Sequence, residues 1–171
     1  MLTEEEYFRF NYFTAWADPR KKKYRIIYFL RVIVLYGAVA LLYILATGSR
    51  LIWFDISVFV VTGVAYLFLI PFFIKKSVRR RVNDILSKKE NQHILEPSEI
   101  VLSSSGIIDR DTVSESRYDW EAIVHHADTP DGYYLYTSSY HAIVIPKRAV
   151  QTAAELQELE GLLHSHLPLS A

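Results

Sequence analysis

Residues 32–49 read VIVLYGAVALLYILATGS and residues 56–74 read ISVFVVTGVAYLFLIPFFI, two runs without a single charged side chain. As α-helices these runs extend over about 27 and 29 Å, which matches the hydrocarbon thickness of a bilayer. Core helices of soluble proteins are usually shorter than such runs. The sequence therefore predicts two transmembrane helices, residues 26–47 and 52–74, joined by a tight turn at residues 48–50.

Basic residues gather on one side of this predicted hairpin, just before the first run and just after the second, whereas Arg50 stands alone at the turn. Retained positive charge marks the cytoplasmic side, so we expect a multi-pass protein of the cell membrane with both termini in the cytoplasm. Each cation near an anionic leaflet contributes about 1 kcal/mol, so we expect these residues to bind anionic lipid headgroups. We call them the basic collar: Arg20, Lys21, Lys22, Lys23, Arg25, Lys75, Lys76, Arg79, Arg80 and Arg81.

Charge is segregated along the 171-residue chain, although its 19 Lys and Arg balance its 19 Asp and Glu. Residues 1–90 carry 15 basic and 7 acidic side chains, and residues 91–171 carry 4 and 12. This pattern excludes a disordered chain and a wholly basic nucleic-acid binder, and we expect no nucleic-acid partner. The absence of cysteine excludes disulfides and thiolate metal sites.

The N-terminal segment, residues 1–25, combines a helix start with a group of aromatic side chains. Thr3 and Glu6 have the spacing of a capping box. Phe8, Tyr12 and Trp16 recur every fourth residue, which places them on one helical face. Two interpretations remain open: this helix lies in the headgroup region, or its rings pack on the cytoplasmic domain.

Residues 75–91 keep a helical pattern after the second run, and we expect a basic juxtamembrane helix there. From residue 92 to residue 171 the composition changes to short β-type runs and turn residues, followed by a leucine-rich helix that Thr152 and Glu155 cap. This pattern predicts a small rolled sheet plugged by the final helix, and an α+β membrane protein as a whole. The expected strands are residues 92–95, 99–103, 106–109, 113–118, 122–127, 133–137 and 142–145.

Residues 99–163 contain the segments EIVLSSSGI, RYDWEAIVHHADTPDGYYLYTS and HAIVIPKRAV. Together with the preceding hairpin, these segments resemble the YcxB-like membrane proteins of bacteria. The resemblance implies a pleckstrin-homology-like fold, a small β-roll or barrel with a C-terminal helix. It implies no catalytic residue, cofactor or substrate.

The reactive side chains form no recognisable catalytic or metal constellation. His125 and His126 point to opposite faces of a strand, and Ser103–Gly106 reads as a turn rather than a nucleophile elbow. We interpret Trp120 as a core residue rather than a ligand platform. We therefore expect no catalytic, cofactor or metal site.

The resulting hypothesis is a membrane-anchored cytoplasmic interaction module without catalytic activity, which binds a protein partner or a second copy of itself. Two alternatives are a subunit of an oligomeric transport or channel assembly, and a membrane enzyme that uses His125 or His141.

The orientation of the hairpin can be tested because the chain contains no cysteine. Single cysteines at Ser87 and Ser139 should resist a membrane-impermeant maleimide added to intact cells, and a cysteine at Ser49 should react. Labelling at the first two sites without labelling at Ser49 would overturn the predicted topology.

Overall fold

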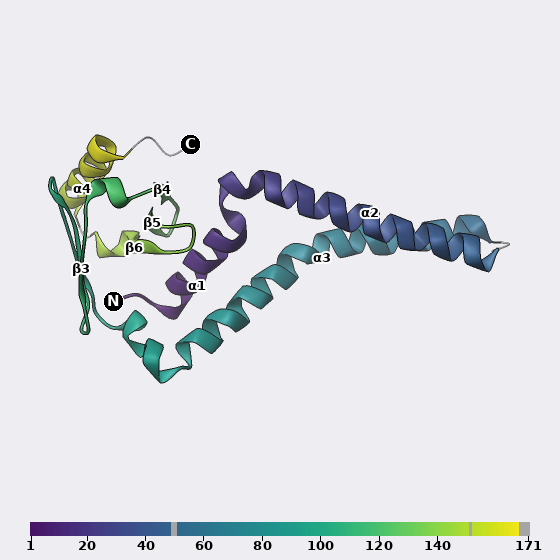
Figure 1. Ribbon diagram of the computed structural model, residues 1–171, viewed down its shortest axis with the longest axis horizontal. Coiled ribbons are helices and arrows are strands. Elements are labelled where there is room, and N and C mark those ends of the chain that lie inside the picture. The colour runs from purple at the N-terminus through teal and green to yellow at the C-terminus, as the bar shows by residue number, and fades with distance from the viewer. Residues whose placement is uncertain (49–50, 151, 168–171) are drawn as a thin grey trace. The chain divides into compact units, whose positions relative to one another are not determined.

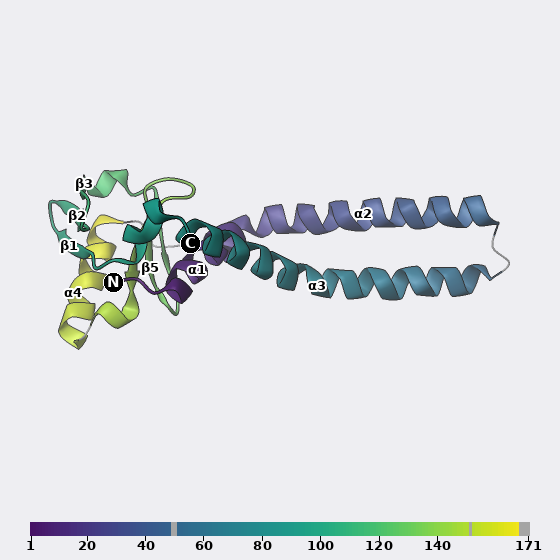
Figure 2. The ribbon, with the colours of Figure 1, turned by 90° about the horizontal axis from the view of Figure 1, so that it is seen from below.

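The computed structural model describes residues 1–48, 51–150 and 152–167, and it divides into two units (Figures 1 and 2). One unit consists of residues 1–11 and 81–171 and is called the domain below. The other consists of residues 12–80 and is called the apolar hairpin. The protein is α+β, as expected.

The apolar hairpin contains α2 (Lys22–Thr47) and most of α3 (Ile52–Leu86), which run side by side in Figure 2. Both helices are long and apolar enough to span a membrane. A left-handed Gly48, at φ 55°, ends α2, and residues 49 and 50 of the predicted turn lie outside the described residues. The helix expected at residues 75–91 is the last part of α3, which ends at Leu86.

Contacts near the middle of the hairpin show that the two helices are antiparallel. The Tyr36 hydroxyl lies 2.5 Å from Thr62 Oγ1, and the Tyr43 ring lies 5.5 Å from that of Phe59. Gly63 makes room for Tyr36, because a Cβ at this position would lie 3.0 Å from the tyrosine ring. A polar pair inside an apolar surface thus fixes the register of the hairpin.

The chain between α1 (Glu4–Tyr12) and α2 tightens and turns. Phe13–Ala17 is π-helical and Pro19–Lys21 is a 3-10 turn. The wider π turn changes the side-chain direction, so Trp16 packs on Tyr28 and Phe29 of α2, at 5.9 Å from each ring. The prediction that Phe8, Tyr12 and Trp16 form one face is therefore wrong.

The same connection uses two residues of the basic collar. Lys21 Nζ donates to the carbonyl of Thr14, and the Arg25 guanidinium donates to the carbonyls of Trp16 and Asp18. Cations commonly satisfy the last carbonyls of a helix in this way. These two side chains therefore stabilise the turn as well as adding charge.

The domain contains two antiparallel three-stranded sheets, in the orders β1-β2-β3 and β4-β5-β6. Six of the seven expected strands are present: β1 has the expected ends, and the other five have shifted ends. The expected strand at residues 92–95 is wrong: it belongs to a 3-10 segment, Lys89–Leu95, which Asn91 ties to the end of α3 through the Ile85 carbonyl. The strands are β1 (Glu99–Ser103), β2 (Gly106–Arg110), β3 (Glu115–Tyr118), β4 (His125–Asp128), β5 (Gly132–Tyr136) and β6 (Ala142–Pro146).

The hydrophobic core lies between these sheets and α4 (Ala153–His166). The predicted capping box of α4 is confirmed, with Thr152 and Glu155 exchanging side-chain to backbone hydrogen bonds. Trp120 is also a core residue, as predicted, and its Nε1 donates to the Ser103 carbonyl at 2.9 Å. The buried members of the core are Ile107, Trp120, Ile123, Tyr133, Leu135, Ile143, Ile145, Leu159, Leu163 and Leu167.

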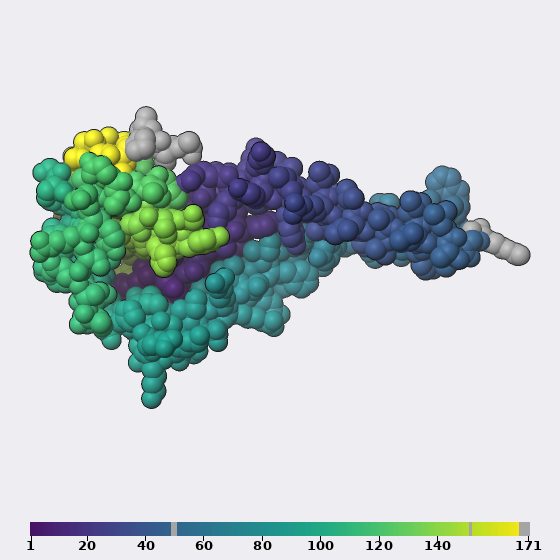
Figure 3. Space-filling model, viewed as in Figure 1, coloured from purple at the N-terminus to yellow at the C-terminus, as the bar shows by residue number. Residues whose placement is uncertain are grey.

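Helix α1 covers the other face of the β4-β5-β6 sheet. Phe10 is buried, 5.3 Å from the ring of Tyr134 and 6.1 Å from that of Tyr136. In Figure 3 the darkest purple atoms, at the start of the chain, accordingly lie against the yellow-green part of the domain. Every residue of β5 is buried as a result. Of the two interpretations of the aromatic segment, packing on the domain holds for residues 1–11.

Replacing Phe10 by alanine should remove the ring that joins α1 to β5. Truncation of a buried phenylalanine costs about 3–5 kcal/mol. We expect the free energy of opening of the β5 amides, measured by native-state hydrogen exchange on the full-length protein, to fall by about 3 kcal/mol. The control is Tyr140→Ala, since Tyr140 is 73% exposed. Equal, small effects of both substitutions would contradict the packing of α1 on the domain.

Candidate functional site

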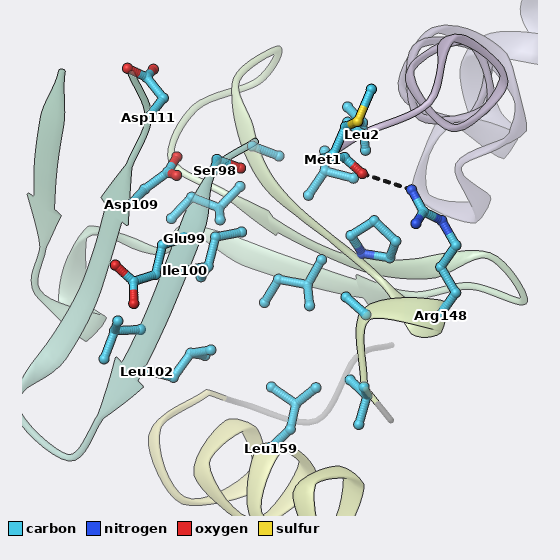
Figure 4. Close-up of a pocket in the computed structure, with 18 of the residues that line it drawn as sticks. Met1, Leu2, Ser98, Glu99, Ile100, Leu102, Asp109, Asp111, Arg148 and Leu159 are labelled. Carbon is cyan, nitrogen blue, oxygen red and sulfur yellow. Dashed lines mark hydrogen bonds between the residues drawn. The ribbon is translucent and has the colours of Figure 1, made fainter. Parts of the chain in front are cut away.

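A cavity of about 900 Å³ lies within the domain and opens onto its hydrophobic core. Figure 4 shows β1 on one side, Arg148 on the other, Leu159 of α4 below, and Met1 and Leu2 above. This volume lies in the range of small-molecule sites. Its apolar floor is formed by side chains from both sheets and from α4: Ile100, Leu102, Ile143, Ile145, Leu159 and Leu162.

The cavity separates the free edges of the two sheets. Strands β1 and β6 are terminal strands of their sheets, and each is paired on one side only within the described residues. Consecutive residues 98–102 and 142–146 line the cavity. Neighbouring side chains of a strand point to opposite faces, so a strand that contributes five residues in a row presents its edge to the cavity. Unpaired strand edges are templates for another strand.

The rim of the cavity is acidic. Burial raises the pKa of Asp109, and the nearby carboxylate of Asp111 adds to this shift. The backbone N–H groups of Val113 and Ser114 lower the pKa of Asp111 by hydrogen bonding. The ionised form of Asp109 is therefore destabilised, and a cation bound nearby would stabilise it. The lining carboxylates are Glu96, Glu99, Asp109, Asp111, Glu155 and Glu158.

Arg148 is the single Lys or Arg among the described lining residues, and the N-terminal segment holds it. Its guanidinium donates to both carboxylate oxygens of Glu6, at 2.5 and 2.8 Å. It also donates to the Met1 carbonyl at 2.7 Å, the hydrogen bond drawn in Figure 4. The hydrogen bonds from Arg148 lower the pKa of Glu6 to about 2. A second pair, Arg9 with Asp131, joins α1 to the β4–β5 turn. The one lining guanidinium is thus already neutralised.

The residues singled out from the sequence lie elsewhere. None of the ten collar residues, all of which are described, lines the cavity, and neither does His125 or His141. The His125 ring stacks on Tyr136 at 4.0 Å, and His141 is exposed in the β5–β6 turn. Among the described residues, no three His, Asp or Glu side chains are grouped to hold a metal ion. Eight collar residues are exposed: Arg20, Lys22, Lys23, Lys75, Lys76, Arg79, Arg80 and Arg81.

Sequence reasoning missed the cavity itself. The acidic excess after residue 91 was visible in the composition, but its concentration around one opening depends on how the two sheets face each other. The only local signal was at residues 92–97, where a strand was expected immediately before Pro97. The edge of β1 that lines the cavity is unpaired within the described residues.

Comparison with known proteins identifies part of the domain. A family model described as YcxB-like protein matches residues 102–163, which confirms the resemblance for this segment. The chain therefore contains a YcxB-like domain preceded by two apolar helices. The matched segment covers β2–β6 and most of α4, whereas α1 and most of β1 lie outside it. No curated protein and no solved structure matches the chain.

The ion pair between Glu6 and Arg148 gives the attachment of α1 a defined pH dependence. The folded pKa of Glu6 lies near 2, below its ordinary value of 4.5. Its contribution is therefore complete above about pH 4.5 and is lost as the pH falls toward 2. Because Arg148 is 54% exposed, we expect a contribution of about 1 kcal/mol at most.

Glu6→Gln should thus lower the stability of the full-length protein in urea by up to about 1 kcal/mol at pH 6, by less at pH 3, and by little near pH 2. Glu4→Gln on the same helix is the control. If the difference in stability between Glu6→Gln and the wild type is the same at every pH, the ion pair contributes nothing to stability.

Proposed function

We propose that this protein is a membrane-anchored binding module without catalytic activity. In this proposal α2 and α3 cross the cell membrane, both termini lie in the cytoplasm, and the domain binds a partner at the inner face. The observation that carries the proposal is the cavity, which combines an apolar floor, an acidic rim and two free strand edges.

Anchoring is supported by the apolar surface of the helices and by the cations at their ends. In the helix that ends at Thr47, none of the 18 most apolar consecutive residues is buried. In α3, 6% of the corresponding residues are buried. Such a surface needs lipid or protein around it. The eight exposed collar residues give the hairpin a basic end, which suits anionic lipid headgroups.

A pleckstrin-homology-like domain is the fold that we assign to this module. The supporting features are two small antiparallel sheets in succession and a C-terminal helix packed against the core between them. Many lipid-binding sites use clustered cations. Because the cavity has six carboxylates and one paired arginine, we propose a polypeptide partner here, either another protein or a second copy of this chain.

Site-specific crosslinking tests whether the cavity binds a partner. Val101 lines the cavity and is 42% exposed, and Val124 lies outside the lining and is 63% exposed. Single cysteines at these positions can carry a benzophenone, because the chain has no other thiol. In native membranes we expect Val101→Cys to yield a discrete protein adduct, which Glu158→Lys weakens, and Val124→Cys to yield none.

An adduct of twice the chain mass would identify a second copy as the partner. Identical patterns from both positions, or no adduct from Val101→Cys, would contradict binding in the cavity.

A further inference from the structure

We infer that the cavity takes an extended peptide whose side chains alternate between apolar and cationic, and that this peptide pairs with the free edge of β6. This inference rests on the proposed function and names the chemistry of the partner. It follows from three properties of the cavity: the hydrogen-bonding groups of the β6 edge, the apolar floor and the acidic rim.

The register of the β5–β6 ladder shows which backbone groups of β6 face outward. Lys147 N–H donates to the Asp131 carbonyl and Thr137 N–H to the His141 carbonyl, both at 3.0 Å. In this register, Tyr133 opposite Ile145 and Leu135 opposite Ile143 are also hydrogen-bonded pairs. The backbone groups of the intervening residues point away from β5. Ala142 and Val144 therefore direct their N–H and C=O groups to the free edge.

An added strand beside β6 would place alternate side chains on opposite faces. One set would meet the apolar floor around Ile143, Ile145 and Leu159, and the other set would meet solvent and the acidic rim. Main-chain hydrogen bonds supply affinity in this mode of recognition, and the alternate side chains supply specificity. The edge of β1 across the cavity offers a second row of backbone groups.

The charge of the rim selects the sign of the peptide. Of the six lining carboxylates, Glu99 is already paired with Arg110 at 3.0 Å. The one guanidinium among the described lining residues, that of Arg148, is bound by Glu6. The rim would repel acidic peptides and anionic lipid headgroups, and it would attract lysine and arginine side chains. A bound cation would also lower the pKa of Asp109, which burial raises.

This chemistry points to a class of natural partner. Cytoplasmic segments next to transmembrane helices are enriched in lysine and arginine and are adjacent to apolar sequence. A domain anchored at the same membrane surface meets such segments at high effective concentration. We therefore assign the site to a basic juxtamembrane segment of another membrane protein.

The test uses the full-length protein in nanodiscs of zwitterionic lipid and the fluorescein-labelled peptide KVKLKVKLK. Fluorescence anisotropy should show saturable binding that weakens with salt. The peptides EVELEVELE, with the charge reversed, and KSKSKSKSK, with the apolar positions replaced, should each bind at least about tenfold more weakly. Empty nanodiscs correct for binding to lipid.

Two substitutions separate strand pairing from attraction by charge. Val144→Pro removes the outward N–H, which an edge strand tolerates, and should weaken binding about fivefold to tenfold. Val144→Thr keeps the N–H and should bind like the wild type. Glu158→Lys should weaken binding without affecting the β6 edge. Hydrogen exchange of β5 verifies that each variant is folded.

The decisive measurement is hydrogen exchange of the wild type, because it needs no variant. The bound peptide should protect the amides of Ala142 and Val144. Binding without this protection, equal binding of the acidic peptide, or insensitivity to Val144→Pro in a folded variant would overturn the inference. If none of the peptides binds but Val101→Cys still crosslinks to a protein, the proposed binding module is retained and only this assignment of its partner is wrong.

Discussion

The domain depends on a strand that is buried on both faces. Tyr133 and Leu135 of β5 pack into the core, and Tyr134 and Tyr136 face α1 on the other side. Large aromatic rings dominate the energetics of small cores, so β5 needs a cover on each face. Helix α4 and the β1-β2-β3 sheet provide one cover, and the first residues of the chain provide the other. The YcxB-like segment at residues 102–163 therefore does not contain everything that its central strand requires.

Features that depend on neighbouring residues could be read from the sequence, and features that depend on distant ones could not. Both capping boxes, Thr3 with Glu6 and Thr152 with Glu155, were predicted and are present, because two residues three positions apart decide each of them. The strands from β1 to β6 were predicted from short apolar runs. The wrong strand at residues 92–95 has a similar composition, but its chain folds back onto α3 through Asn91 and forms a 3-10 segment.

The candidate site was the least predictable part of the protein. The alternating side chains of β5 indicate that the strand has two faces, but only the tertiary structure shows that α1 covers one of them. The cavity arises because two sheets end opposite each other, and no single segment carries a sign of that. Charge is distributed differently in the two units: cations lie at one end of the apolar hairpin, and carboxylates line the cavity of the domain. Arg148, which lines the cavity, binds Glu6 and the Met1 carbonyl and so holds the start of the chain.

The contact between Glu6 and Arg148 joins residues 142 positions apart, and both predicted membrane helices lie between them in the chain. During synthesis α1 leaves the ribosome first, and β5 and Arg148 follow only after both apolar helices have emerged. Contacts of such long sequence separation form late, because the closure of a long loop must precede them. The domain consequently completes its fold only after both apolar helices have been synthesised. Until then, Phe10 of α1 lacks the β5 rings on which it packs.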